Sequence, residues 1–308
     1  MVQKGIMRDS ASRPRVSVGM PVYNRESYVA EAIEAHLRQT YTDFELVITD
    51  NNSTDRSGEI CRAYAARDPR VKYFRNEENL GAAGNFRRCF ELSQGEYFRW
   101  HPSDDLVGPE LLELCVEVLD RDLSVITAYP RTRLIDAFGE IISDYDENLH
   151  IMDERPSVRF REVLKRLRLC NLQYGLSRRD KLARTGLLRS YAGGDIPLIA
   201  EMSLYGKFFE VPEHLFYRRM HEEASSAMKD NKDVMAFFDP KKREKIFLRH
   251  WVHLGAHYRS VWRAPLNLSE KLTLSGYLLK QLKWSHEVYS EELSQAARQF
   301  LQRATHSS

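Results

Sequence analysis

The chain has 308 residues, 43% hydrophobic and 29% charged, a composition that excludes a disordered chain and suits one large domain or a domain with an appendage. Its 46 Lys and Arg nearly balance its 44 Asp and Glu, and the net charge of +2 argues against a protein that coats nucleic acid. The four cysteines form no CxxC pair, which predicts buried thiols in a reducing compartment rather than a zinc site or a disulfide framework.

Over the first 130 residues, short runs of β-branched or aromatic residues alternate with stretches of helical period. This alternation predicts a doubly wound, mainly parallel sheet. The expected strands are 16–19, 44–49, 71–75, 97–100 and 125–129, and the expected helices are 28–39, 55–67, 84–93 and 109–120. Ligands of such sheets bind beyond the carboxyl ends of the strands, so we expect the chemistry in the loops that follow each strand.

After residue 130 the alternation breaks down. We expect a hairpin over 133–142, a basic helix over 157–169, a strand over 173–176, a helix over 196–205 and strands over 208–211 and 215–217. Beyond Pro240 helical spacing predicts two or three helices. The predicted organisation is a flexible segment 1–14, a domain 15–225 with halves 15–130 and 131–225, and a helical extension 240–308.

Two common nucleotide-binding signatures are missing. The loop after the first expected strand, Gly19 to Asn24, has no GxGxxG pattern, and Pro21 removes a backbone amide that such a turn points at a pyrophosphate. The chain also lacks a GxxxxGK[ST] pattern. The sequence therefore gives no support to a dinucleotide site of the NAD type or to a P-loop.

The loops after the second and third expected strands carry polar and small residues. Asp50 opens a run through Asp55 whose side chains suit helix capping, and capping alone would explain this loop. The loop 76–85 contains Asn79 and Gly81 among small residues that permit tight turns and the close approach of a ligand. Neither loop identifies a site by itself.

The loop after the fourth expected strand places Asp104 and Asp105 side by side at the binding edge, where we expect them to be exposed. Adjacent carboxylates repel each other unless a positive charge neutralises them, and hard oxygen ligands suit Mg²⁺ or Mn²⁺ that carries substrate phosphates. The alternative is an ordinary helix-entry loop.

Together these loops resemble the large family 2 of inverting nucleotide-sugar glycosyltransferases, which are built on the GT-A fold. The matching segments are 21–24, 50–55, 79–81 and 103–105, and the segments 193–195 and 216–221 are similar to the acceptor-side half of these enzymes. The resemblance is detailed over about residues 15–120, thinner to about 225 and absent from the tail. It implies an α/β fold of the GT-A type, Rossmann-like and mainly parallel, here with an α-helical C-terminal extension.

The resemblance also implies roles for individual residues. Asp50 matches the residue that contacts the nucleotide base. Asp105 matches the metal-ligating carboxylate, and Asp104 matches its neighbour, which faces the ribose or a metal-bound water. Asp195 matches the general base, and His221 matches a position close to the metal or diphosphate. Arg218 or Arg219 would offset the charge of the diphosphate. The residues implied to bind the donor are Pro21, Tyr23, Asn24, Asp50, Asn79, Gly81, Asp104, Arg218 and Arg219.

The sequence departs from the family pattern at several positions. Pro102 replaces the first Asp of the usual Asp-x-Asp-Asp, and Asn51 and Asn52 stand where a second acidic residue is frequent. Gly194 replaces a Glu that often precedes the base, and the alternative for Asp195 is a helix N-cap. For His221 the alternative is a surface histidine on a loop.

The predicted function is metal-dependent transfer of a sugar, with inversion, from a nucleoside diphosphate donor such as a UDP-sugar to a hydroxyl acceptor: a glycan, a lipid-linked sugar or a small molecule. Mn²⁺ or Mg²⁺ is the implied cofactor. The alternatives are a non-catalytic scaffold that binds nucleotide sugars and a sugar-phosphate nucleotidyltransferase; the latter would need a Gly-rich, basic first loop that is missing here.

The tail and the location of the protein complete the sequence-based predictions. No apolar run approaches the ~20 residues that span a bilayer, and the first 15 residues lack the apolar stretch of a signal peptide, so we expect a cytoplasmic protein. Residues 241–290 mix basic residues with Phe and Trp, which suits peripheral contact with the inner face of an anionic membrane. The alternative is packing on the domain or on a second subunit.

Overall fold

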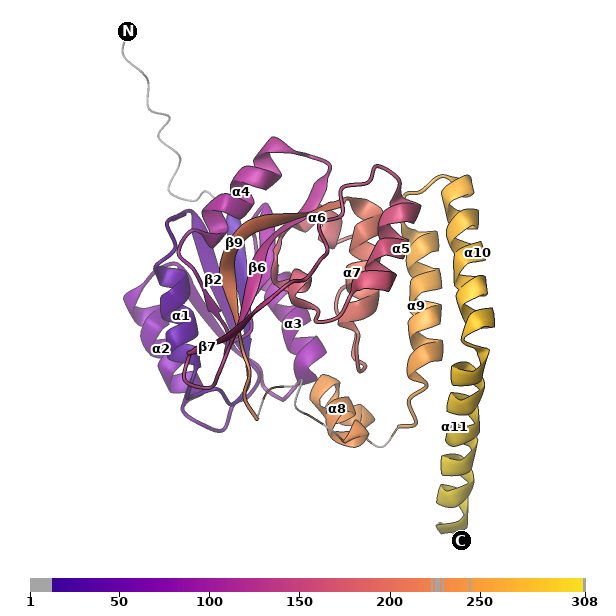
Figure 1. Cartoon of the computed structure of the whole chain (residues 1–308). Coiled ribbons are helices and arrows are strands. Elements are labelled where there is room, and N and C mark those ends of the chain that lie inside the picture. Colours follow the sequence, from indigo (N-terminus) through magenta and orange to yellow (C-terminus); the bar gives the residue numbers. More distant parts are fainter. Residues whose placement is uncertain (1–12, 223, 225–227, 229, 244, 307–308) are drawn as a thin grey trace.

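A computed structural model describes residues 13–222, 224, 228, 230–243 and 245–306. The predicted flexible segment 1–14 lies almost entirely outside these residues. Nine strands of the described part form one sheet, in the order β3-β2-β1-β4-β8-β6-β9-β5, with β7 paired to β6 (Figure 1).

The first half of the sheet is parallel, as predicted. β1 (Val16–Val22) pairs with β2 (Phe44–Asp50) and β4 (Tyr97–Trp100), and β2 pairs with β3 (Val71–Arg75). Every residue of β1, β2 and β4 is buried, because helices cover both faces of this half of the sheet. The carboxyl ends of these four strands therefore meet at one edge.

The second half of the sheet is mixed. β8 (Leu176–Arg178) pairs antiparallel with β4 and with β6 (Val125–Ile135), and β6 runs parallel to β9 (Lys207–Arg219). β5 (Leu106–Val107) pairs antiparallel with β9, and β7 (Ile141–Tyr145) forms the predicted hairpin with β6. The pairing of β5 with β9 brings the loop that holds Asp104 and Asp105 next to the end of β9.

Two hydrophobic clusters lie on the two faces of the sheet. α1 (Val29–Leu37), α2 (Ser57–Arg67) and α4 (Leu111–Arg121) contribute to one cluster. α3 (Gly81–Leu92), α5 (Pro156–Arg166) and α7 (Asp195–Tyr205) contribute to the other, and the short α6 (Arg179–Leu182) follows β8. β6 contributes to both clusters: Val125 and Ala128 belong to the first, and Ile126 and Tyr129 belong to the second.

The tail consists of α8 (Asn231–Phe238), the short 3₁₀ helix η3 (Pro240–Lys242), α9 (Arg249–Arg263), α10 (Leu268–Trp284) and α11 (His286–His306). Val261 of α9 and Leu274 and Leu278 of α10 join the second hydrophobic cluster, so these helices pack on the domain. The start of α11 packs beside the start of α9, where Trp251 Nε1 donates to the carbonyl of Tyr289, and the rest of α11 extends beyond α9 (Figure 1). No described helix is both long and apolar enough to cross a membrane.

Two expectations about strands were wrong. Residues 171–174 form a 3₁₀ helix, η1 (Asn171–Tyr174), and the strand β8 begins two residues later. The two strands expected over 208–217 are one strand, β9, whose pairing with β6 skips two residues between Val211 and His214. Pro212 lacks an N–H donor, so the polar interruption that suggested a loop is an irregularity within a continuous strand.

Candidate active site

Asp50 ends β2 with its side chain completely buried. It accepts hydrogen bonds from the backbone N–H of Ser53 at 2.8 Å, the hydroxyl of Tyr73 at 2.7 Å and the guanidinium of Arg75 at 2.7 Å. No surface of the carboxylate is open to a ligand. The structure thus differs from the predicted direct contact with a nucleotide base: here Asp50 holds Arg75 and the Ser53 loop in place.

The loop after β1 is tied to the loop after β2. Asn24, with a positive φ of 50°, donates its backbone N–H to Ser53 Oγ at 3.1 Å, and its side-chain oxygen accepts the N–H of Thr54 at 2.9 Å. Pro21 is buried within β1, whereas Tyr23 is 42% exposed. Of the four residues 21–24, Tyr23 therefore presents the most open side chain to a ligand.

Asn79 and Gly81 shape the start of α3. Asn79 accepts hydrogen bonds from the side chain of Asn51 at 2.7 Å and from the N–H of Gly81 at 2.8 Å. Gly81 has φ +70°, and a Cβ there would lie 2.4 Å from the carbonyl oxygen of Phe238 at the end of α8. The glycine thus makes room for the end of α8, and its contact with the donor stays a prediction.

Asp104 lies where the segments that follow β1, β4 and β9 come together. Its Oδ2 is 3.2 Å from Arg25 Nε and 3.1 Å from His221 Nε2. Burial alone would raise the pKa of Asp104, but the hydrogen bond with His221 and the charge of Arg25 outweigh it and lower the pKa. The His221 side chain is only 4% exposed and packs on Tyr28, which overturns the alternative of a surface histidine.

Asp105 is 4% exposed, contrary to the expectation of an exposed pair. Its Oδ1 accepts the backbone N–H of Arg219 at 2.8 Å, which fixes the loop to β9. Burial, with the adjacent charge of Asp104, raises the pKa of Asp105 well above its usual value. A metal cation beside Asp104 and Asp105 would relieve the repulsion between the two carboxylates.

The two arginines that end β9 have different surroundings. Arg219 is buried and donates to the carbonyl oxygens of Asp104 and Ala137 and to the Glu31 carboxylate. The Arg219 side chain is only 1% exposed, so Arg219 clamps the Asp104 loop to β9. Arg218 is half-buried and donates to Asn171 Oδ1 at 2.7 Å, and its contact with a diphosphate stays a prediction.

Asp195 is the first residue of α7, and Gly194 occupies the N-cap position; Asp195 Oδ1 nevertheless accepts the backbone N–H of Ile196 in the first turn at 2.9 Å. Tyr174 is partly buried, and burial raises its pKa. The charge of Arg218 lowers this pKa, and the charges of Asp105, Asp195 and Asp104 raise it.

The turn before Asp195 depends on two glycines and on α9. Gly193 has φ +70°, and a Cβ on Gly194 would lie 2.5 Å from the carbonyl oxygen of Arg189. No side chain fits at position 194, which accounts for the departure from the family pattern. His253 of α9 holds the turn, with Nε2 3.1 Å from the carbonyl oxygen of Ala192.

Four residues at the site escaped the sequence analysis. Arg25 directly follows the matching segment 21–24 and could have been found there. Glu147, Tyr174 and His253 lie outside any motif, and His253 belongs to the tail, where no resemblance was seen. Glu147 is 3% exposed, and burial raises its pKa to about 8.

The chemistry of the donor set fits a divalent cation. The described residues hold no group of three His, Cys, Asp or Glu side chains arranged for a metal. Mg²⁺ is commonly bound through one or two carboxylates and substrate phosphates instead of an all-protein cage. The carboxylates of Asp104 and Asp105, with His221 beside them, meet that requirement.

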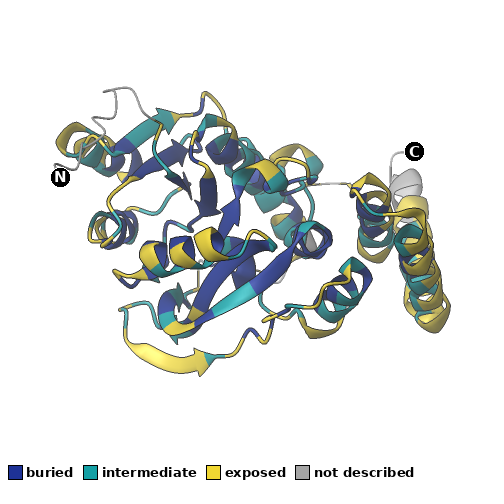
Figure 2. Cartoon of the chain, turned by 90° about the horizontal axis from the view of Figure 1, so that it is seen from above, coloured by how far each residue is buried: buried dark blue, intermediate teal, exposed yellow. Residues whose placement is uncertain are grey.

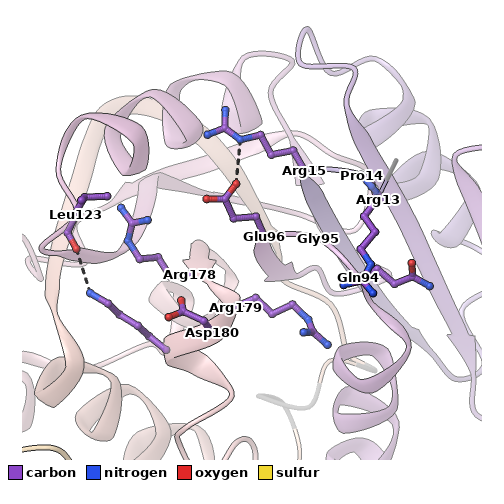
Figure 3. A pocket seen from close by; sticks show the side chains of 11 residues that line it. Arg13, Pro14, Arg15, Gln94, Gly95, Glu96, Leu123, Arg178, Arg179 and Asp180 are labelled. Atoms are coloured by element: carbon purple, nitrogen blue, oxygen red, sulfur yellow. Dashed lines mark hydrogen bonds and ion pairs between the residues drawn. The ribbon is translucent and has the colours of Figure 1, made fainter. Parts of the chain in front are cut away.

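A groove lies at the edge of the sheet opposite the candidate site (Figure 3). This groove of about 760 Å³ is lined by Arg13, Arg15, Glu96, Arg178, Arg179, Lys181 and their neighbours at the amino ends of β1 and β4. Two of its cations have protein partners: Arg15 bonds Glu96, and Lys181 bonds the carbonyl oxygen of Leu123. The groove is far from the predicted site residues and takes no part in the candidate site.

Comparison with known sequences identifies the family. Residues 17–174, just over half of the chain, match the family described as Glycosyl transferase family 2. The chain belongs to this family. One curated relative is the chondroitin synthase of Escherichia coli, which is 29% identical over 70% of this chain and 30% of the relative. Another is glycosyltransferase GlyG of Streptococcus pneumoniae, which is 38% identical over 36% of this chain and 37% of the relative. The chain spans about a third of the length of these two relatives.

Solved structures confirm the predicted fold class. S. aureus TarS 1–349 in complex with UDP-GlcNAc matches with a TM-score of 0.62 and 17% identity, over 89% of this chain and 74% of that one. The mannosyltransferase PcManGT of Pyrobaculum calidifontis, in complex with GDP-Man and Mn²⁺, matches with a TM-score of 0.52 and 18% identity, over 94% and 76%. The family 2 chain thus has the sheet of GT-A glycosyltransferases and helices at its C-terminal end.

Proposed function

We propose that this family 2 chain transfers a sugar from a nucleoside diphosphate donor, with UDP as the nucleotide, to a hydroxyl acceptor by one displacement that inverts the anomeric centre. Family membership supports glycosyl transfer, and the TarS complexes with UDP and UDP-GlcNAc support the choice of donor. The observation that carries the proposal is the carboxylate pair after β4: Asp104 between Arg25 and His221, and Asp105 bonded to the backbone of Arg219.

The donor lies, in this proposal, across the carboxyl ends of β1 and β4. The exposed ring of Tyr23 and the loop of Asn24 form the wall beside the base, and Asp50 shapes this wall from behind through Arg75. Arg218 faces the diphosphate, where a guanidinium forms charge-assisted hydrogen bonds with phosphate oxygens.

The carboxylates of Asp104 and Asp105 would hold Mn²⁺ or Mg²⁺, a choice that the Mn²⁺ in the PcManGT complex supports. When bound, the cation supplies positive charge that stabilises the leaving diphosphate. Arg25 and His221 hold Asp104 in place for that role, and the backbone N–H of Arg219 holds Asp105.

Asp195 is the proposed general base. Its carboxylate takes the proton of the acceptor hydroxyl as the oxygen attacks the anomeric carbon on the face opposite the diphosphate, so the configuration inverts. We place this reaction in the cytoplasm, with the C-terminal helices as the part that contacts a membrane or a second copy of the chain. Nucleic acid is not among the proposed partners.

The test separates donor binding from chemistry. Thermal shifts with nucleoside diphosphates and their sugars, with and without Mn²⁺, identify the donor for the wild type. Asp195→Asn should keep the shift but lower turnover by ~10²–10⁴, the usual contribution of a general base. Asp105→Asn should abolish the Mn²⁺-dependent part of the shift, whereas Asp180→Asn, at the opposite edge, should change neither.

Proton NMR of the product reports the anomeric configuration directly. Retention of configuration would refute the single displacement. Asp195→Asn with turnover within a few-fold of the wild type would show that another group is the base.

A further inference from the structure

The outer surface of α9 and α10 exposes large hydrophobic side chains. Tyr258 and Trp262 of α9 are 46% and 43% exposed, and Leu268, Leu272 and Leu279 of α10 are 63%, 57% and 63% exposed. We call these five residues the tail face. A groove of about 400 Å³ between the two helices, floored by Leu254 and Leu278, reaches Tyr258 and Leu279 of this face. The C-terminal helices, beside the label C in Figure 2, carry long exposed stretches on their ribbons.

The charges of the same two helices are almost all positive. They carry six basic residues, Arg249, Arg259, Arg263, Lys271, Lys280 and Lys283, and one acidic residue, Glu270. Glu270 points toward the domain, where it accepts the backbone N–H of Ser157 at 2.8 Å. Arg263 pairs with Glu201 at 3.1 Å, and Arg249 lies beside Gly193. The cations left around the tail face are Arg259, Lys271, Lys280 and Lys283, and no described carboxylate forms an ion pair with them.

We propose that the tail face docks on the surface of an anionic lipid bilayer. Exposed hydrophobic patches on soluble folds mark interaction surfaces, and a mixture of Trp, Tyr and Leu with Lys and Arg is the composition of helices that lie in a bilayer interface. Lys271 shows the arrangement in detail: its Nζ lies 5.7 Å from the centre of the Trp262 ring and donates to the Trp262 carbonyl oxygen.

Electrostatics decides between a bilayer and a second copy of the chain. Two copies that met through this face would bring two sets of unneutralised cations together, which opposes association. An anionic lipid surface attracts the same cations and accepts the aromatic and leucine side chains at its boundary. Charge complementarity therefore selects the bilayer.

The experiment is flotation of the full chain with vesicles, at low and at high salt. One set is phosphatidylcholine alone, and the other contains one part in four of phosphatidylglycerol. Binding should require the anionic lipid and weaken at high salt. Trp262→Ser with Leu272→Ser should remove it, and Lys280→Glu with Lys283→Glu should lower the partition coefficient at least about tenfold.

Matched controls lie on the other side of the molecule. Phe138→Ser alters an apolar side chain that is 90% exposed at the β6–β7 hairpin, and Arg67→Glu with Arg121→Glu reverses two exposed cations on α2 and α4. Both variants should float like the wild type. Thermal unfolding of each variant verifies that it is folded.

Three results would overturn the proposal. The first is the absence of flotation with both sets of vesicles. The second is equal flotation of the tail-face variants and the controls. The third is a stable wild-type dimer in light scattering that becomes a monomer in the variant Trp262→Ser with Leu272→Ser. That result would assign the face to a second copy of the chain. All readouts are independent of catalysis, so failure of the glycosyl-transfer proposal leaves them interpretable.

Discussion

Glu147 carries an ionisable group in a place that disfavours its charge. It is 3% exposed, and neither carboxylate oxygen has a hydrogen-bond partner among the described residues. Burial raises its pKa from 4.5 to about 8, although the nearby Leu172 amide and the charge of Arg218 favour the ionised form. Between these two pH values the folded chain keeps a proton that the unfolded chain has released.

The free energy of unfolding should therefore fall as the pH rises from 4.5 to about 8. At about 1.4 kcal/mol per pH unit, the loss is at most about 3 kcal/mol at pH 7 and about 5 kcal/mol above pH 8. Glu147→Gln keeps the shape of the side chain and removes the ionisation. The variant should match the wild type near pH 4 and exceed its stability by up to these amounts at higher pH.

Urea unfolding of both proteins across this range measures the difference. The buried His36 and His257 have pKa values lowered to about 3 by burial, so both proteins lose stability as the pH falls below 6.5, and that loss cancels in the comparison. Glu117→Gln, on the exposed side of α4, is the matched control. A stability difference between Glu147→Gln and the wild type that does not change with pH would refute the reasoning.

Three further predictions concern the site and the core. Gly194→Ala should destabilise the turn before Asp195 and lower turnover, because its Cβ would lie 2.5 Å from a backbone oxygen. Gly276→Ala in α10, where a Cβ would meet nothing within 4 Å, should instead stabilise the chain by about 0.5–1 kcal/mol in thermal or urea unfolding. Arg75→Ala should cost about 1–3 kcal/mol of stability and weaken nucleotide binding in calorimetry, since the buried Asp50 loses its cation; unchanged values would contradict the supporting role given to this pair. The three fully buried cysteines, whose pKa values burial raises to about 12, should resist alkylation until the protein unfolds, and rapid labelling of native protein would disprove this.

The parallel half of the fold could be predicted because its signals are local. Strands β3 and β4 begin and end where the β-branched and aromatic runs do, and the hairpin turns at the predicted residues. The loops of the candidate site were also found from sequence, since parallel strands bring their carboxyl ends to one edge. What a strand pattern cannot show is pairing between distant segments, and β5, only two residues long, forms through its pairing with β9.

The roles of individual side chains were harder to predict than their positions. Asp50 and Arg219 are both at the predicted site, yet protein partners saturate each of them: Arg75 and Tyr73 for the first, and Glu31 with two carbonyl oxygens for the second. A motif fixes the residue type and the loop. It does not reveal which partners from other elements consume the hydrogen-bonding capacity of that side chain.

The tail is connected to both halves of the candidate site. The end of α8 packs so closely on Gly81 that no side chain fits there, and His253 of α9 bonds the turn that precedes Asp195. The segment that matches the family ends at residue 174, so neither contact follows from family membership. Because α9 also carries Tyr258 and Trp262 of the tail face, contact of that face with a bilayer would bear directly on the helix that holds the turn of the proposed base.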